Sequence, residues 1–183
     1  AHAADLAHHL SHAGGFGDRT SLVRYLTIAG DRAFEAAAFY DSVGHFERAL
    51  SVIPAGDQRG RAQLLERLAM ALRSVGRWDD ALQRMNEALD GYQALNEVEP
   101  IGRLGWAMVY QLTWSARLVE GVQVGQRTLA ALGDAVSADK ARVLSALGWA
   151  VSISGDYAAA TATFDQARAL AGQSCANSTI GGT

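Results

Sequence analysis

The sequence predicts an all-α protein, an α-solenoid built from antiparallel helix pairs. Apolar residues recur at helical spacing along almost the whole chain, and no stretch shows the alternation typical of a strand. One pattern also occurs three times, over 69–82, 112–121 and 147–160: a helical run, a short turn, an aromatic residue or Leu, a small residue three positions on, and a second helical run. Helix pairs that repeat every 30–50 residues or so are typical of solenoids, which usually serve as binding scaffolds.

Composition limits the possible partners. The 183 residues are 49% apolar, which suits one continuous array, and the formal net charge is only −3. No general attraction for nucleic acid or anionic membranes is therefore expected. The lone Cys175 excludes an intramolecular disulfide framework and favours the cytoplasm. There is no signal segment or membrane-spanning apolar run, and because the chain begins at Ala1 we expect a fragment of a longer protein.

The first third of the chain predicts four short helices. Glycines mark the expected breaks, because glycine commonly ends a helix. Pro54 is expected to close the last of the four. The predicted helices run from the first residues to Gly14-Gly15 and then over 21–29, 34–43 and 46–53.

The remaining helices are predicted as longer pairs. Gly76 is expected to separate the first pair, and Pro100 to lie in the first turn of the following helix. The expected helices include 64–75, 78–92, 106–113, 118–132, 138–154 and 157–171. We therefore expect residues 1–171 to form a repeat array of about five helix pairs, and the segment 172–183, rich in Gly, Ser, Thr and Asn, to be a flexible tail.

The predicted turns define the repeat length. They fall at Gly44, Gly76, Ala116 and Gly155, which gives spacings of 32, 40 and 39 residues. Each pair has an apolar face that it cannot bury alone, so neighbouring pairs must stack.

These residues resemble the tetratricopeptide repeat (TPR). The last repeat matches the family's spacing at Leu147, Gly148, Tyr157, Ala160, Phe164 and Ala167. An earlier repeat matches it at Leu68, Ala69, Trp78, Ala81, Met85 and Ala88. The repeat between them departs from the pattern, with Gly121 and Gly125 where Ala and Phe are expected. The resemblance implies a right-handed superhelix whose first helices line a concave groove.

Three early segments resemble a group of proteins that is narrower than the TPR family as a whole. Residues 6–10, 25–33 and 45–50 resemble the MalT-like helical region that follows the ATPase module of large bacterial signalling proteins, such as LuxR-type transcription activators and ATPase-cyclase fusions. In those proteins the repeats sense an inducer or a partner. The resemblance implies that this chain is the sensor or interaction region of such a protein.

No residue pattern supports catalysis. His8 and His12 share a helix face at a spacing that can chelate a metal, but no third ligand completes the site, so surface histidines are the better reading. The segment 14–18 has neither the preceding strand nor the Gly-Lys-Ser/Thr of a P-loop. No group is placed to activate Cys175. We expect no catalytic residue, cofactor or metal.

The candidate binding residues are aromatic. Trp106, Tyr110 and Trp114 recur every four residues, so they share one helix face, and Trp149 takes the equivalent place in the next repeat. In the TPR register this face lines the groove, with Arg103, Arg142, Met70 and Arg73 beside it. The alternative is that these aromatics fill the core of an atypical repeat or dock a neighbouring domain. A loss of several kcal/mol in Trp106→Ala or Trp114→Ala would indicate a core role.

The expected partner is a protein segment or a small inducer in the concave groove, together with neighbouring domains of the parent protein. The Lys and Asn clamp of chaperone-binding TPR domains is absent, because Lys140 is the only lysine. Three interpretations stay open: a sensor region, a spacer or dimerisation region of an ATPase-linked cyclase, and a free-standing adaptor. Exposed apolar end faces would favour self-association.

Overall fold

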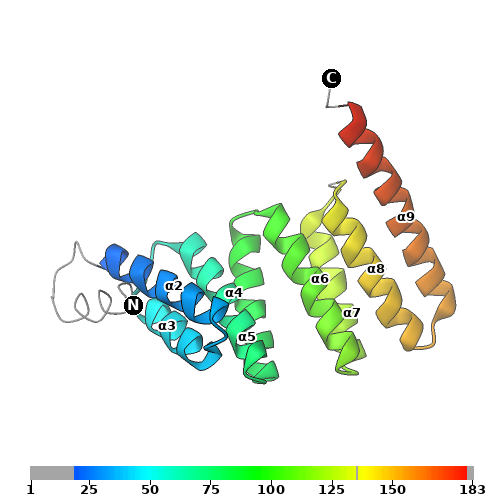
Figure 1. The fold of residues 1–183 in the computed structure, drawn as a ribbon. Helices are drawn as coiled ribbons and strands as arrows, with labels where there is room; N and C mark the ends of the chain where they lie inside the picture. The colour runs from blue at the N-terminus through cyan, green and yellow to red at the C-terminus, as the bar shows by residue number, and fades with distance from the viewer. Residues whose placement is uncertain (1–18, 135, 181–183) are drawn as a thin grey trace. The chain divides into compact units, whose positions relative to one another are not determined.

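The computed structural model describes residues 19–134 and 136–180, and every regular element within them is an α-helix (Figure 1). The predicted first helix, with His8 and His12, and the segment 14–18 lie outside the described residues. The chain divides after Leu95 into two compact units. Each unit is described by itself below.

Within the described residues, each unit contains two helix pairs. In the first unit α2 packs against α3, α3 against α4, and α4 against α5. In the second unit α6 packs against α7 and α8, and α8 packs against α7 and α9. The bounds are α2 Arg19–Glu35, α3 Phe39–Val52, α4 Gln58–Ser74, α5 Trp78–Ala94, α6 Val98–Trp114, α7 Leu118–Leu132, α8 Ala138–Ile153 and α9 Tyr157–Ile180. This is the all-α helix-pair architecture of a solenoid repeat.

The predicted helix breaks at Gly30 and Gly44 are wrong. Gly30 is buried within α2 beneath the ring of Phe46, and its carbonyl oxygen accepts a hydrogen bond from Ser42 Oγ at 2.9 Å. Gly30 therefore permits a close helix approach and does not end a helix. Gly44 lies within α3, where no other group approaches its Cα hydrogens. The four short helices expected before Pro54 are thus reduced, within the described residues, to α2 and α3.

The same turn joins the two helices of successive pairs. After α4, Gly76 adopts φ +79°, Gly76 N donates to Arg73 O at 3.0 Å, and Arg77 N donates to Leu72 O at 2.9 Å. This pair of bonds is a Schellman motif, which satisfies the last carbonyls of a helix. Ala37 (φ 57°) and Ala116 (φ 57°) repeat the motif, and Gly155 (φ 93°) ends α8.

These turns correct the repeat length. The first turn is at Ala37 and not at Gly44, so the spacings are 39, 40 and 39 residues. The repeat is more regular than the sequence pattern suggested. Positions below are therefore counted from the four turn residues Ala37, Gly76, Ala116 and Gly155.

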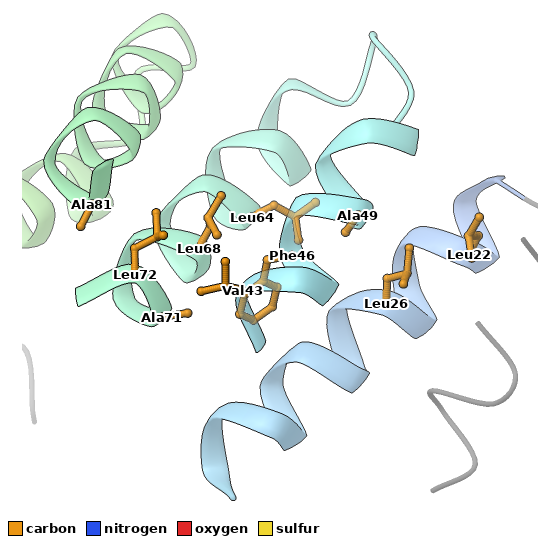
Figure 2. Packing of buried hydrophobic residues seen from close by; sticks show 10 residues of the cluster. All are labelled: Leu22, Leu26, Val43, Phe46, Ala49, Leu64, Leu68, Ala71, Leu72 and Ala81. Atoms are coloured by element: carbon orange, nitrogen blue, oxygen red, sulfur yellow. The ribbon is translucent and has the colours of Figure 1, made fainter. Parts of the chain in front are cut away.

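The core of the first unit is a continuous apolar cluster contributed by all four helices (Figure 2). Phe46 of α3 is 1% exposed at its centre, between Leu26 of α2 and Leu68 of α4. Burying a side chain of this size contributes about 1.5–3 kcal/mol to stability. The labelled members are Leu22, Leu26, Val43, Phe46, Ala49, Leu64, Leu68, Ala71, Leu72 and Ala81.

The second unit buries Met108, Val109 and Leu112 of α6 beside Val143 and Leu147 of α8. Gly121 and Gly125 lie on the buried side of α7 and allow it to approach α6 and α8 closely. A Cβ on Gly125 would lie 3.1 Å from Leu147 Cδ1 and 3.3 Å from Val109 Cγ2. The unusual glycines of this repeat therefore match larger residues on the helices that they face.

The last helix continues past Ala171, where the sequence predicts its end, to Ile180. No proline follows Ala171, and one Gly in a helix costs only about 1 kcal/mol. The expected division into an array over 1–171 and a flexible tail over 172–183 stays a prediction. Within 19–134 and 136–180, no helix combines the length and the hydropathy needed to cross a bilayer.

Candidate binding site: an exposed aromatic face on α6

Three aromatic side chains form a row along α6. The ring centroids of Trp106 and Tyr110 are 5.9 Å apart, and those of Tyr110 and Trp114 are 6.0 Å apart at an interplanar angle of 60°. The three side chains are 38%, 50% and 67% exposed. We call these three residues the aromatic face.

The aromatic face is distinct from the buried side of α6. Ile101, Leu104, Met108 and Leu112 are at most 3% exposed and face the core of the second unit. Successive residues of a helix are about 100° apart, so the row of every fourth residue beginning at Trp106 points elsewhere. The burial values therefore do not support the alternative that these aromatics fill a core.

The equivalent positions on α4 and α8 are also apolar and exposed, whereas α2 has Asp31 there. Tyr110 lies six residues before its turn residue, as do Trp149 on α8 and Met70 on α4. Trp149 is 51% exposed and Met70 is 45% exposed. Ile153, at the position equivalent to Trp114, is 52% exposed. Large apolar side chains that recur on one exposed helix face mark an interaction surface more often than scattered ones do.

The predicted arginines occupy different environments. Arg103 and Arg142 are exposed at equivalent positions on α6 and α8, thirteen residues before the turn. Arg142 Nη1 lies 3.2 Å from Asp139 Oδ1 on its own helix. Arg73, on α4 of the first unit, is half-buried, and its Nε is buried without a hydrogen-bond partner among the described residues. Six of the eight predicted site residues thus lie in the second unit, and Met70 and Arg73 lie in the first.

A cavity of about 460 Å³ adjoins the aromatic face at Trp106. Its lining includes small residues from α8 and α9, together with Arg142 of α8 and Phe164 and Arg168 of α9. The sequence analysis missed Phe164 and Arg168 as site residues. Aligning the repeats on their turn residues reveals Arg168, which stands where the other described pairs have leucine. Phe164 occupies the position of the buried Phe46 and gives no such signal. The remaining lining residues are Ala138, Ala141, Ser145, Ala167 and Ala171.

Many ionisable groups of the described residues form ion pairs on the helix surfaces. No group of three or more His, Cys, Asp or Glu side chains within residues 19–134 and 136–180 is placed to hold a metal ion. Several carboxylates pair with an arginine three residues away on their own helix. The hydrogen bond from Arg117 lowers the pKa of the exposed Glu120 carboxyl. These groups act as helix-surface ion pairs.

Several solved structures are similar to this chain. BtubC (BKLC) from P. vanneervenii has a TM-score of 0.72 and 16% identity, over 99% of this chain and 72% of that one. Apo RapI has a TM-score of 0.70 and 14% identity, over 90% of this chain and 60% of that one. The kinesin light chain TPR-like repeats from Podosopora anserina have a TM-score of 0.65 and 11% identity, over 93% of this chain and 84% of that one. No protein-family model matches the sequence, and no curated protein does.

These similarities establish the fold class. The chain is a TPR-like helical repeat protein, as the even turn spacing and the helix pairs indicate. At 11–16% identity, the likeness carries the fold and no function.

Proposed function

We propose that this chain is a non-catalytic interaction scaffold whose aromatic face binds a segment of a partner protein. The observation that carries the proposal is the exposure of Trp106, Tyr110 and Trp114, whose rings contact one another in a row along one first helix. The TPR-like fold supports the proposal, since one similar structure is a Rap protein complexed with competence and sporulation factor, at a TM-score of 0.54 and 16% identity. That complex is a property of the Rap protein and serves here as a precedent.

The chemistry of the aromatic face suits a polypeptide. Trp and Tyr offer large, rigid apolar surfaces that lose little side-chain entropy on binding, and they are enriched among residues that dominate interface energetics. Trp149 extends the apolar surface to α8. Removing a central aromatic residue from such a surface commonly costs 2 kcal/mol or more of binding free energy, about a thirtyfold loss of affinity.

We further propose that the scaffold is the sensor region of a larger, cytoplasmic bacterial regulator. The resemblance of 25–33 and 45–50 to MalT-like regions supports this context, and both segments lie on described helices, α2 and α3. The third segment, 6–10, lies outside the described residues. The complete gene tests the proposal: a P-loop ATPase upstream, with a helix-turn-helix domain in the same protein, would support a transcription regulator.

Two other roles make different predictions. A spacer or dimerisation region of an ATPase-linked cyclase requires a cyclase domain in the gene and no effect of the aromatic face on ligand binding. A free-standing adaptor requires a start codon just before Ala1. A small inducer in place of a protein segment would bind without any cross-link to a polypeptide.

Site-specific photocrosslinking tests the binding role. A benzoyl-phenylalanine at position 110 or 149 should cross-link to one discrete partner in cells of the source organism. The same group at Gln123, exposed on α7, serves as the control. Adding Trp106→Ala and Trp114→Ala should remove the cross-link at position 110. Equal yields at 110 and 123, or none at 110 and 149, would refute the proposal.

A further inference from the structure

The cavity between α8 and α9 lies where the other described helix pairs place a large side chain. The residue sixteen positions after the turn is bulky in the first three described pairs: Ile53, Tyr92 and Leu132. In the α8–α9 pair it is Ala171, which lines the cavity. The side chain that fills this position elsewhere is therefore missing here.

The α4–α5 pair shows what a filled position looks like. Tyr92 of α5 is 2% exposed, and its hydroxyl donates to Glu66 Oε2 of α4 at 2.9 Å. The residue equivalent to Glu66, ten positions before the turn, is Ser145 in α8. Both partners of the Tyr92–Glu66 contact are thus replaced by small residues around the cavity.

The same pair of helices gains positive charge. Thirteen residues after the turn, the first three described pairs have Leu50, Leu89 and Leu129, whereas α9 has Arg168. Arg142 also lines the cavity, from α8; the equivalent residues are Arg24 on α2, Gln63 on α4 and Arg103 on α6, so the arginine that is particular to the last pair is Arg168. The side chains of Arg142 and Arg168 are 64% and 84% exposed, and each forms an ion pair with an aspartate three residues earlier on its own helix. Such exposed pairs contribute about 0–1 kcal/mol, so exchanging the aspartate for a ligand carboxylate costs little.

We infer that this cavity receives an aromatic side chain of an acidic polypeptide segment. The aromatic ring takes the place of the missing bulky side chain, between Phe164 and Trp106. Carboxylates that flank the ring in the segment pair with Arg142 and Arg168. The inference deepens the proposed function, on which it rests, by specifying the chemistry of the partner.

The position of Trp106, which belongs to both the cavity and the aromatic face, favours a polypeptide ligand over a small molecule. Trp106 belongs to both the cavity and the aromatic face, so an occupant of the cavity can continue along Tyr110 and Trp114. A volume of about 460 Å³ admits one large side chain and the backbone beside it. An arginine on each side selects acidic neighbours, because arginine forms planar two-bond contacts with carboxylates.

Fluorescence anisotropy with labelled peptides of about ten residues tests this inference. The probe has one central Tyr flanked by Glu on both sides within a Ser and Gly background, and two matched probes replace Tyr by Ala or Glu by Lys. We expect the first probe to bind the full chain at least about tenfold more tightly than either of the others. Equal binding of all three, or no binding at millimolar protein, would overturn the inference.

Variants taken from the chain's own repeats locate the contact. Ala171→Tyr introduces the residue of the α4–α5 pair, and should fill the cavity and weaken the acidic Tyr probe about tenfold or more. Ala162→Tyr, exposed on α9 outside the cavity lining, is the matched control and should leave binding unchanged. Circular dichroism and thermal unfolding confirm that both variants fold. Arg142→Gln and Arg168→Leu, the residues of the α4–α5 pair, should abolish the preference for Glu over Lys without filling the cavity.

The outcomes separate this inference from the broader proposal. If Tyr110→Ala weakens the probe and Ala171→Tyr does not, the aromatic face binds the segment and the cavity does not take its ring. If N-acetyltyrosine competes as well as the peptide does, the ligand is a small aromatic acid and the inference fails. If light scattering shows that Ala171→Tyr dissociates a dimer of the chain, the occupant is a second copy, which also overturns it.

Discussion

Gly30 of α2 lies directly beneath the ring of Phe46 in α3, with no space for a methyl group between them. A Cβ on Gly30 would lie 2.5 Å from Phe46 Cε1. The same arrangement recurs in the last pair, where a Cβ on Gly148 would lie 3.0 Å from Phe164 Cε1. In the α6–α7 pair the sizes are reversed, with Val109 on the first helix and Gly125 on the second. Each of these pairs thus places one glycine opposite one larger residue.

Gly30→Ala should destabilise the chain by about 1–3 kcal/mol, because the added methyl group must displace the ring of Phe46 or separate α2 from α3. Urea unfolding followed by circular dichroism measures the change. Gly44→Ala is the matched control, since nothing approaches within 4 Å of its Cβ position in α3. It should stabilise by about 0.5–1 kcal/mol through helix propensity. Stabilisation by both variants would contradict the close packing at Gly30.

Exchanging alanine and glycine at two turn residues should change the stability of the chain in opposite directions. Ala116 adopts φ 57°, a conformation that costs an alanine about 1–2 kcal/mol, so Ala116→Gly should raise the free energy of unfolding by about 1 kcal/mol. Gly76 adopts φ 79° in the same turn of another pair, so Gly76→Ala should lower it by a similar amount. Thermal or urea unfolding detects both changes. Effects of the same sign would show that the turn conformations differ.

Trp114→Ala should change stability by less than about 0.5 kcal/mol, because the side chain is 67% exposed. Leu112→Ala, two residues earlier on the same helix, should cost about 2–5 kcal/mol because Leu112 is 2% exposed. Chemical denaturation compares the two. A loss of several kcal/mol in Trp114→Ala would restore the core interpretation of the aromatic face.

Tyr92→Phe tests the contact between α4 and α5. The variant keeps the ring but removes the hydroxyl that donates to Glu66, a hydrogen bond to an acidic side chain inside the unit. We expect a loss of about 1.5–3 kcal/mol in the free energy of unfolding. The double variant Tyr92→Phe/Glu66→Gln should lose less than the sum of the single changes, because the two residues interact. Additive losses would show that the bond contributes no coupling.

The charge state of His45 links stability to pH. Burial lowers the pKa of its imidazole, the nearby Arg48 lowers it further, and Asp41 partly raises it. Because the pKa in the folded state lies below that in the unfolded state, the unfolded chain takes up the proton first as the pH falls. The neutral form of His45 therefore favours the folded state. Its stabilising effect is complete above about pH 6.5, the ordinary histidine pKa, and is lost as the pH falls through the folded-state pKa. Site-resolved NMR titration should show the lowered pKa, and Arg48→Gln should raise it.

The sequence predicted the repeat class correctly because the helical spacing and the turn glycines are local signals. The turns at Gly76 and Gly155 are predicted because glycine favours positive φ, and the turn at Ala116 because the repeat pattern places it there. The turn at Ala37 is missed because Gly44, seven residues later, gives a misleading turn signal within α3. Gly30 was misread for the opposite reason. A glycine that lets Phe46 approach looks, in sequence, the same as one that ends a helix.

The candidate binding residues likewise depend partly on local sequence patterns and partly on tertiary packing. Periodicity placed Trp106, Tyr110 and Trp114 on one face of one helix, but only the packed structure decided that this face is exposed, because burial depends on which side of α6 meets α7 and α8. The cavity at Ala171 depends on residues from three helices, and no single helical pattern contains it. Sequence alone thus determined the helices that follow Pro54, most of their turns and the helix-pair class, since these follow from local conformational preferences. The tertiary structure decided which glycines are contacts, which aromatics are exposed and where the repeat leaves a space, since each of these depends on the residues that another helix brings opposite.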